Sequence, residues 1–171
     1  MSSNENNPVF IIGAPRTGST ILYQLLTNEL DVIYIDNLVD IFHRNLFAAL
    51  KTSNKLFGSK PHNCFESVHG NTWKCGLHAP SECGDFWYQW LPRDRHYITV
   101  SDVDKNDIDQ IKNNINAVLS FFQKPFVFKN MNAGLRLQLI KAAAPDTKFI
   151  FVKRDPVDTA ISILNVRQKI Y

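Results

Sequence analysis

The segment Pro8-Val9-Phe10-Ile11-Ile12-Gly13-Ala14-Pro15-Arg16-Thr17-Gly18-Ser19-Thr20 decides how the rest of the chain is interpreted. Its apolar half is β-branched and aromatic, has no helical period and stops at Gly13, as a buried parallel strand does. Within residues 19–29, apolar side chains then recur at helical spacing, at Ile21, Leu22, Leu25 and Leu26. The segment therefore predicts a strand, a tight loop and a helix in direct succession.

The loop in this segment has the glycine spacing of a phosphate-binding loop. Backbone N–H groups at the start of a helix lack an acceptor within the helix, and the helix dipole adds partial positive charge. The hydroxyls of Thr17, Ser19 and Thr20 add donors. Nucleotide triphosphatases need lysine directly after the second glycine, but this chain has Ser19 there and carries Arg16 inside the loop. The pattern predicts an anion site, and the alternative is a strand-to-helix turn without a ligand.

A second pattern of this kind is Phe149-Ile150-Phe151-Val152-Lys153-Arg154-Asp155-Pro156. Arg154 follows a buried strand, and Asp155-Pro156 is a favourable start for a helix. Ser162 lies about two turns along that helix. Because parallel sheets bind ligands where their strands end, we predict that Arg154 and Ser162 hold a second, separate phosphate. The alternative is a surface ion pair between Arg154 and Asp158.

The remaining sequence alternates strands with helices, which predicts a parallel sheet covered on both faces. From residue 52 to 103 helical periodicity largely fails, so we expect a long excursion over the sheet edge with a short helix inside it. The chain ends inside a predicted helix and shows only four strands, which favours an incomplete domain. We expect strands at 8–12, 32–35, 125–129 and 148–153, and helices at 19–29, 38–50, 81–91, 104–122 (capped by Asp104), 134–144 and from 156 onward.

Length and composition favour one globular domain, residues 1–171, behind a disordered tail of residues 1–7. Lys and Arg number 19 against 16 Asp and Glu, a small excess that does not indicate a nucleic-acid-binding tail. Neither a membrane-length apolar run nor a secretory signal is present, so we expect a cytoplasmic protein without an integral membrane segment. The three cysteines are an odd number, which argues against a disulfide framework.

Both anion-binding segments resemble the sulfotransferases that use 3′-phosphoadenosine 5′-phosphosulfate (PAPS), in particular a broad bacterial group. That group has a first loop close to GAPRSGTT and a second motif close to FIxxxRDPxDxxxS, which appear here as GAPRTGST and FIFVKRDPVDTAIS. Residues 126–130 and 144–148 are also similar to the family. The resemblance runs from about Val9 to Leu164 and is weak across 52–103.

The resemblance implies a P-loop nucleoside triphosphate hydrolase-like fold, with three α/β/α layers around a central parallel sheet. It implies that Arg154 and Ser162 bind the 3′-phosphate of PAPS, and that Arg16 stabilises charge on the transferred group. PAPS would be the co-substrate, with no metal expected, and the acceptor a hydroxyl or amine of a carbohydrate or small molecule reached from residues 52–103. The residues implied to hold the 5′-phosphosulfate are Pro15, Arg16, Thr17, Gly18, Ser19 and Thr20.

Glu82 is the first candidate for the general base that the acceptor needs, because related sequences often carry Pro-x-x-Glu here. A glutamate at a helix start is alternatively only a favourable partner of the helix dipole. Asp36, at the end of a predicted strand, is the second candidate, and His43 and His78 are others. Lys129 ends a strand and is a candidate contact for the sulfate, the alternative being a solvated lysine.

Aromatic residues and cysteines raise two further hypotheses. Trp73, Trp87, Tyr88 and Trp90 are candidates for a sugar-stacking or apolar acceptor wall, although such clusters more often form a core. A zinc site would have to come from the group Cys64, His69, Cys75, His78 and Cys83, whose spacings match no common zinc module.

Two other functions remain open at this stage. A kinase-like enzyme that uses a nucleoside triphosphate would employ Asp36 to hold magnesium at a strand end, but Ser19 in place of the lysine counts against it. A non-catalytic nucleotide-binding module is the other alternative.

Overall fold

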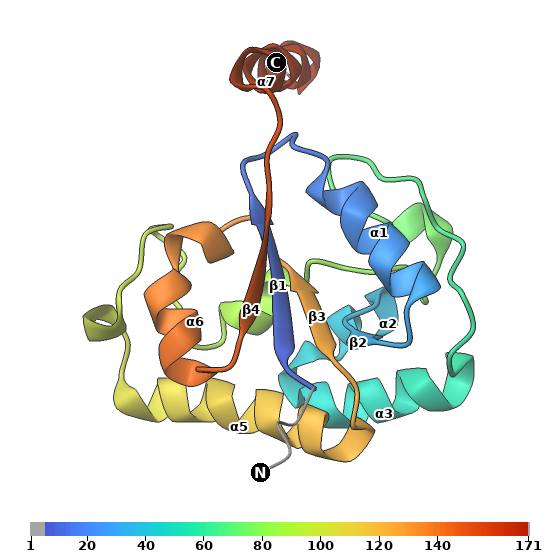
Figure 1. Cartoon of the computed structure of the whole chain (residues 1–171), viewed down its shortest axis with the longest axis vertical. Helices are drawn as coiled ribbons and strands as arrows, with labels where there is room; N and C mark the ends of the chain where they lie inside the picture. Colours follow the sequence, from blue (N-terminus) through green and yellow to red (C-terminus); the bar gives the residue numbers. More distant parts are fainter. Residues whose placement is uncertain (1–5, 171) are drawn as a thin grey trace.

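A four-stranded parallel sheet forms the centre of the computed structural model, which describes residues 6–170 (Figure 1). The strand order is β2-β3-β1-β4, and every neighbouring pair is parallel. All four predicted strands are present, and the predicted α/β class is confirmed. Their bounds are β1 Pro8–Gly13, β2 Ile33–Tyr34, β3 Phe126–Lys129 and β4 Lys148–Val152.

Helices connect the strands and pack around the sheet. Short 3₁₀ turns lie at His43–Asn45, Trp73–Cys75, Val100–Asp102 and Ala133–Leu135. No helix of the described residues is long and apolar enough to cross a membrane. The helices are α1 Ser19–Glu29, α2 Asn37–Ile41, α3 Leu46–Phe57, α4 Gly84–Trp87, α5 Lys105–Phe122, α6 Leu137–Ala143 and α7 Pro156–Ile170.

The predicted helix 38–50 is two helices, which corrects the expectation. The backbone leaves the helical region at Phe42, and the side chain of Asn45 accepts a hydrogen bond from the amide of Ala48 (3.2 Å), which starts a new helix. This second helix, α3, continues to Phe57 and ends at Gly58, whose φ is +63°. The irregular excursion therefore begins later than expected.

Three smaller differences concern the ends of other helices. The predicted helix 81–91 is reduced to the single turn α4. Asp104 precedes α5, but its side chain makes no capping hydrogen bond. The predicted helix 134–144 begins with a 3₁₀ turn before α6.

Of the expected disordered tail, residues 1–5 lie outside the described residues, and residues 6 and 7 precede β1 without regular structure.

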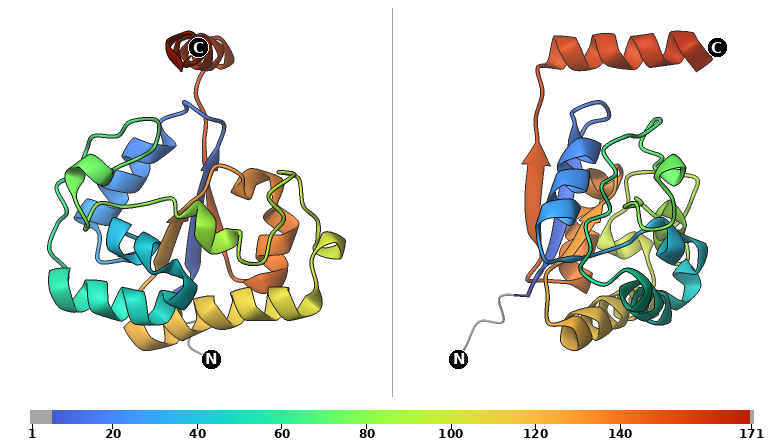
Figure 2. Two further views of the ribbon diagram at one scale, coloured as in Figure 1. Left: turned by 180° about the vertical axis from the view of Figure 1, so that it is seen from behind. Right: turned by 90° about the vertical axis from the view of Figure 1, so that its right-hand side faces the viewer.

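Alternate side chains of β1 enter two cores, one on each face of the sheet. Phe10 and Ile12 belong to the larger core, which α2 to α6 complete. Ile11 belongs to the smaller core on the other face, where Tyr23 of α1 and Val127 of β3 pack against it. The left view in Figure 2 shows the sheet with α1 on one side and α6 on the other. Helices thus cover both faces of β1 and β3, as the alternating pattern predicts. The expectation of a buried strand before Arg154 is wrong, because β4 is exposed or half-buried along its length.

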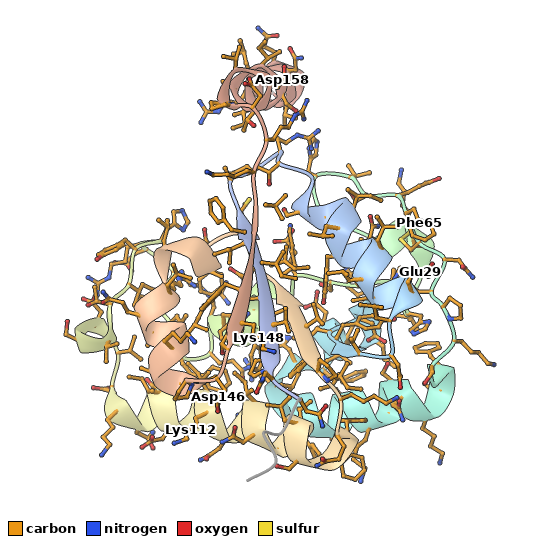
Figure 3. The ribbon with its side chains drawn as sticks, in the orientation of Figure 1. Glu29, Phe65, Lys112, Asp146, Lys148 and Asp158 are labelled. Atoms are coloured by element: carbon orange, nitrogen blue, oxygen red, sulfur yellow. A yellow bond between two sulfur atoms is a disulfide. The ribbon has the colours of Figure 1, made fainter. Side chains whose placement is uncertain are left out.

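Strand β4 is an edge of the sheet, and α7 lies beyond its end. Figure 3 labels Lys148 at the start of β4 and Asp158 in the first turn of α7. In Figures 1 and 2, α7 runs across the strand direction, near the loop that joins β1 to α1. Phe151 is 62% exposed, and Val157, Ile161 and Leu164 of α7 are also exposed. The strand thus carries the chain to the end of the sheet where the first loop lies.

The close approach of β1 and β4 at this end depends on Gly13. A Cβ atom at this position would lie 2.7 Å from the carbonyl oxygen of Val152 and 3.0 Å from Oγ1 of Thr17. We expect Gly13→Ala to lower the free energy of unfolding by about 1 to 3 kcal/mol, because either β4 or the loop that contains Thr17 must shift to admit the new Cβ atom. Urea unfolding measures this difference.

Gly134→Ala is the matched control, since a Cβ there meets nothing within 4 Å. This control should change stability by no more than about 0.5 kcal/mol. Equal unfolding midpoints for the two variants would show that Gly13 is not required for the close approach.

Candidate active site

The loop between β1 and α1 turns its backbone toward solvent at the start of α1. Gly18 occupies the N-cap position with φ +92°, and Arg16 also has a left-handed φ of +67°. No side chain caps α1, so its first amides have no partner from a capping residue. Thr17 donates its hydroxyl to the carbonyl of Ala14 at 2.8 Å, which holds the loop closed. The helix start is therefore open to an anion.

A pocket of about 460 Å³ lies in front of this loop, and we call it the cationic pocket. Arg16, Lys129 and Arg154 line it, with Glu82 as the only carboxylate among its lining residues. Three cationic groups against one carboxylate favour a ligand that carries several negative charges. The complete lining is Pro15, Arg16, Gly18, Ser19, Thr20, Ile21, Ser67, His69, Gly70, Glu82, Lys129, Met131, Arg154 and Val166.

The two predicted anion-binding segments meet at this pocket. Arg16 donates from Nε to Oγ of Ser162 at 3.0 Å, and Arg154 donates from Nη1 to the carbonyl of Arg16 at 3.3 Å. The structure describes no ion pair between Arg154 and Asp158. Asp155 caps α7 by accepting from the amides of Val157 and Asp158, at 2.9 and 3.1 Å. The cap directs α7 so that Ser162 contacts the first loop.

Lys129 and Glu82 form an ion pair at the inner wall of the cationic pocket. The side chain of Lys129 is 6% exposed and that of Glu82 is 26% exposed, so the lysine is not the solvated strand-end residue of the alternative interpretation. Gly70 packs against this pair, since a Cβ there would lie 2.8 Å from Oε1 of Glu82. A buried charge without its partner is strongly unfavourable, so the ion pair fixes the positions of both side chains.

Asp36, the other candidate base, lies away from the cationic pocket. Its carboxylate accepts from the amide of Val39 at 2.8 Å and from the hydroxyl of Ser53, which makes it the cap of α2. Burial raises its pKa to about 6. Asp36 lines a separate cavity, together with Tyr34 and His78.

The two candidate histidines are also outside the cationic pocket. His78 bonds through Nε2 to the hydroxyl of Tyr34 at 2.9 Å, and burial lowers its pKa. The ring of His43 bonds through Nδ1 to the carbonyl of Asp40 at 2.6 Å. Both imidazoles are thus held by local contacts.

Of the four candidate aromatic residues, one is open to a ligand. Trp87 is 5% exposed in the larger core, and Trp90 packs against that core. Tyr88 is covered by the guanidinium of Arg93, 4.8 Å from the ring centre. Trp73 is 43% exposed and lines a second pocket. The core interpretation thus holds for Trp87 and Trp90.

This second pocket, of about 280 Å³, adjoins the cationic pocket, and we call it the carboxylate pocket after Asp40 and Glu82. Sequence reasoning did not single out Asp40, because nothing in its neighbourhood along the chain separates it from an ordinary helical aspartate. The two pockets share His69, Gly70, Glu82 and Met131. The lining residues that belong to the carboxylate pocket alone are Asn37, Asp40, Asn71, Thr72, Trp73, Ser81, Cys83 and Gly84.

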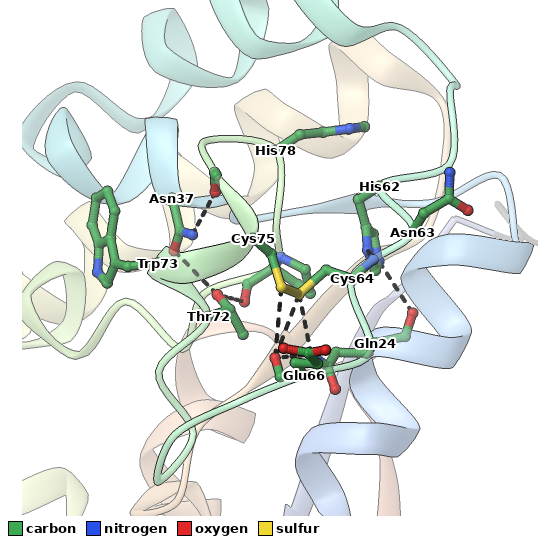
Figure 4. Close-up of a disulfide and its surroundings, with 12 residues drawn as sticks. Gln24, Asn37, His62, Asn63, Cys64, Glu66, Thr72, Trp73, Cys75 and His78 are labelled. Atoms are coloured by element: carbon green, nitrogen blue, oxygen red, sulfur yellow. Dashed lines mark hydrogen bonds between the residues drawn. A yellow bond between two sulfur atoms is a disulfide. The ribbon is translucent and has the colours of Figure 1, made fainter.

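The segment between α3 and α4 contains a disulfide, contrary to the expectation from the cysteine count. Cys64 and Cys75 are bonded, with Cα atoms 5.7 Å apart, and Cys83 is free and buried (Figure 4). The three cysteines are thus one disulfide-bonded pair and one free thiol. Gln24 of α1 donates to the carbonyl of Glu66 at 2.9 Å, which ties the closed loop to α1. Disulfides are rare in cytosolic proteins, so this bond counts against the cytoplasmic expectation.

The disulfide also bears on metal binding. Two of the five residues considered for zinc are bonded to each other, so they offer no thiolate in this state. Among the described residues, ligand atoms of Asp40, His43 and Cys83 lie within 4.8 Å of one another. Burial, followed by the charge of Asp40, raises the pKa of the Cys83 thiol, which disfavours the thiolate that a metal needs.

Two comparisons with known proteins match most of the chain. The model of a family described as the sulfotransferase family matches residues 8–168. The crystal structure of sulfotransferase STF1 from Mycobacterium tuberculosis H37Rv (type1 form) is similar, with a TM-score of 0.50 at 18% sequence identity. The match covers 91% of this chain and 47% of that chain, so the present chain spans about half the length of this relative. The likeness confirms the predicted α/β fold with a central parallel sheet, and no curated protein matches the sequence.

The disulfide is expected to stabilise the loop that lines both pockets. Loss of the bond in the double variant Cys64→Ser/Cys75→Ser should lower the free energy of unfolding by about 3 kcal/mol, because the unfolded loop regains freedom. Thermal unfolding with and without reductant measures this. Reductant should destabilise the original protein but not the double variant, in which Cys83 remains as an internal control. An original protein that is insensitive to reductant would contradict the prediction.

Proposed function

Because the chain belongs to the sulfotransferase family, we propose that it transfers a sulfuryl group from PAPS to a hydroxyl or amine of a carbohydrate or small-molecule acceptor. The observation that carries the proposal is the meeting of the two anion-binding segments at one pocket. Arg16 and Arg154 lie there beside an open helix start, although they are far apart in the sequence. A nucleotide with phosphates at two positions needs two such groups of donors at once.

In this proposal the first loop holds the 5′-phosphosulfate. Its donors are the amides at the start of α1 and the hydroxyls of Ser19 and Thr20, both of which line the cationic pocket. The hydroxyl of Thr17 is used within the loop, so we assign Thr17 to loop geometry and to backbone donation. We assign the 3′-phosphate to Arg154 and Ser162, since both come from the second anion-binding segment and both contact Arg16 of the first loop.

Transfer requires stabilisation of charge on the group in flight and on the leaving phosphate. The bond from sulfur to the acceptor atom forms while the bond from sulfur to the bridging oxygen breaks, and the nucleotide leaves with that electron pair. Arg16 and the loop amides stabilise this charge electrostatically without moving far. Lys129 faces the same pocket and is our choice for the sulfuryl oxygens.

Glu82 is our choice for the general base. It lines both pockets, so a hydroxyl in the carboxylate pocket has the carboxylate within reach while sulfur lies in the cationic pocket. The acceptor proton passes to this carboxylate as the new bond forms. Asp36 caps α2 and lines a different cavity, which argues against it both as the base and as a magnesium ligand in a kinase-like reaction.

Nucleotide binding tests the donor assignment. By calorimetric titration without metal, adenosine 3′,5′-bisphosphate should bind, whereas ATP with magnesium should bind weakly or not at all. Arg154→Ala should weaken the bisphosphate by about tenfold or more, as expected for lost charge-assisted bonds of about 1.5 to 3 kcal/mol each. Adenosine 5′-phosphosulfate lacks the 3′-phosphate, so Arg154→Ala should weaken the binding of this nucleotide much less.

Arg93→Ala is the matched control, because Arg93 is an exposed arginine whose ion pair with Asp85 lies outside both pockets. An equal loss for both nucleotides in Arg154→Ala would remove Arg154 from the 3′-phosphate site. Binding of ATP only with magnesium would instead support the kinase-like function, and binding of the bisphosphate without any turnover would support the non-catalytic module.

Turnover tests the base. Glu82→Gln should reduce kcat by about a hundredfold or more, as expected for loss of a general base, while bisphosphate affinity stays nearly unchanged. Glu66→Gln is the control, since Glu66 is exposed in the same segment and lines neither pocket. Unchanged turnover in Glu82→Gln would rule out this assignment.

A further inference from the structure

The carboxylate pocket suggests the chemical class of the acceptor. We propose that this acceptor is a compact amino alcohol, such as an amino sugar, whose protonated amine binds Asp40 while a neighbouring hydroxyl receives the sulfuryl group. The inference rests on the proposed function, and it concerns a different set of side chains from those that bind the donor.

The shared wall places the carboxylate pocket beside the reacting group of the donor. Gly70 and Glu82 belong to both linings, and the absence of a side chain at Gly70 keeps the carboxylate of Glu82 accessible, since a Cβ would lie 2.8 Å from its Oε1. A molecule in the carboxylate pocket therefore meets the candidate base directly. Arg154 lines the cationic pocket only.

The two pockets differ sharply in charge. Three Lys or Arg side chains line the cationic pocket, whereas the lining of the carboxylate pocket contains neither residue type and has Asp40 in addition to Glu82. An acidic acceptor would find no counterion there and would face a carboxylate. A protonated amine finds a counterion, because the structure describes no cation paired with Asp40.

Contacts within the protein hold Asp40 in place. Its Oδ2 accepts a hydrogen bond from the hydroxyl of Ser81 at 2.6 Å, and that hydroxyl in turn accepts from the amide of Cys83 at 3.1 Å. Both partners also line the pocket. A carboxylate fixed in this way loses little freedom when it binds an ammonium group, and a charge-assisted hydrogen bond is among the stronger kinds.

Trp73 completes the recognition surface. Its ring is 43% exposed, and its backbone amide donates to Oδ1 of Asn71 at 3.0 Å. Trp73 lies two residues from the disulfide at Cys75, which restrains this part of the loop (Figure 4). An indole face binds both the apolar face of a sugar ring and a nearby cation.

Size and reactivity agree with a small amino alcohol. The carboxylate pocket measures about 280 Å³, against about 460 Å³ for the cationic pocket. A protonated amine is not a nucleophile, so the amine binds and the hydroxyl reacts. The hydroxyl oxygen bonds to sulfur, its proton goes to Glu82, and the nucleotide leaves with the electrons of the broken sulfur–oxygen bond.

Three sugars that differ in one group test this inference: glucosamine, glucose and glucuronic acid. Ligand-observed NMR measures their binding directly, at a pH where the amine is protonated, and kcat/KM with PAPS measures their use. Glucosamine should bind about tenfold better than glucuronate, with glucose between them. Asp40→Asn should reduce the affinity for glucosamine to the affinity for glucose and leave the affinity for the bisphosphate unchanged.

Asp85→Asn is the matched control, because Asp85 is an exposed carboxylate three residues from Glu82 that pairs with Arg93 outside both pockets. It should preserve the preference for glucosamine. If Asp40→Asn fails to fold, Trp73→Leu replaces it and should likewise weaken glucosamine binding. Equal binding of the three sugars, or a preference for glucuronate, would overturn the inference on the original protein alone. Loss of bisphosphate binding would overturn the proposed function instead, and the NMR ranking would still report on Asp40.

Discussion

The site depends on the parallel pairing of β1 with β4. These strands are distant in sequence, yet their register places Gly13 opposite Val152. The segments that follow the two strands therefore leave the sheet at the same edge and in the same direction. The absent side chain at Gly13 permits the contact. Arg154 then follows within two residues of Val152, which is why it reaches the carbonyl of Arg16. One backbone pairing thus brings together the two segments that the sequence predicts to bind anions.

A second constraint comes from the irregular segment between α3 and α4. This segment has little secondary structure, and its position depends on the disulfide at Cys64 and Cys75 and on hydrogen bonds such as that of Gln24 to Glu66. It supplies Gly70 to the wall next to the ion pair of Glu82 and Lys129. Cross-linking replaces the cooperative backbone bonding that a helix or strand would provide.

Sequence patterns located the elements whose signals are local. Apolar runs ending at Gly13 and Val152 identify the strands, and the capping residue Asp155 followed by Pro156 identifies the start of α7, because each signal lies within a few residues. The break after Ile41 was missed because apolar spacing continues across it. Disulfide pairing depends on distance in space, so the count of cysteines could not reveal it. Asp36 lies at a strand end, as predicted, but its position in the chain does not show that its side chain caps α2.

The same limit explains why the role of Glu82 becomes clearer only in the folded chain. By sequence alone it resembles a residue at a helix start, whereas its partner is Lys129, at the end of β3. Burying this ion pair costs solvation free energy that a pair at the surface would not lose. The carboxylate lines both the cationic pocket, with its three Lys or Arg side chains, and the carboxylate pocket, which contains neither residue type. In the reaction that we propose, a proton taken from the carboxylate pocket reaches Glu82 while negative charge develops beside Arg16 in the cationic pocket.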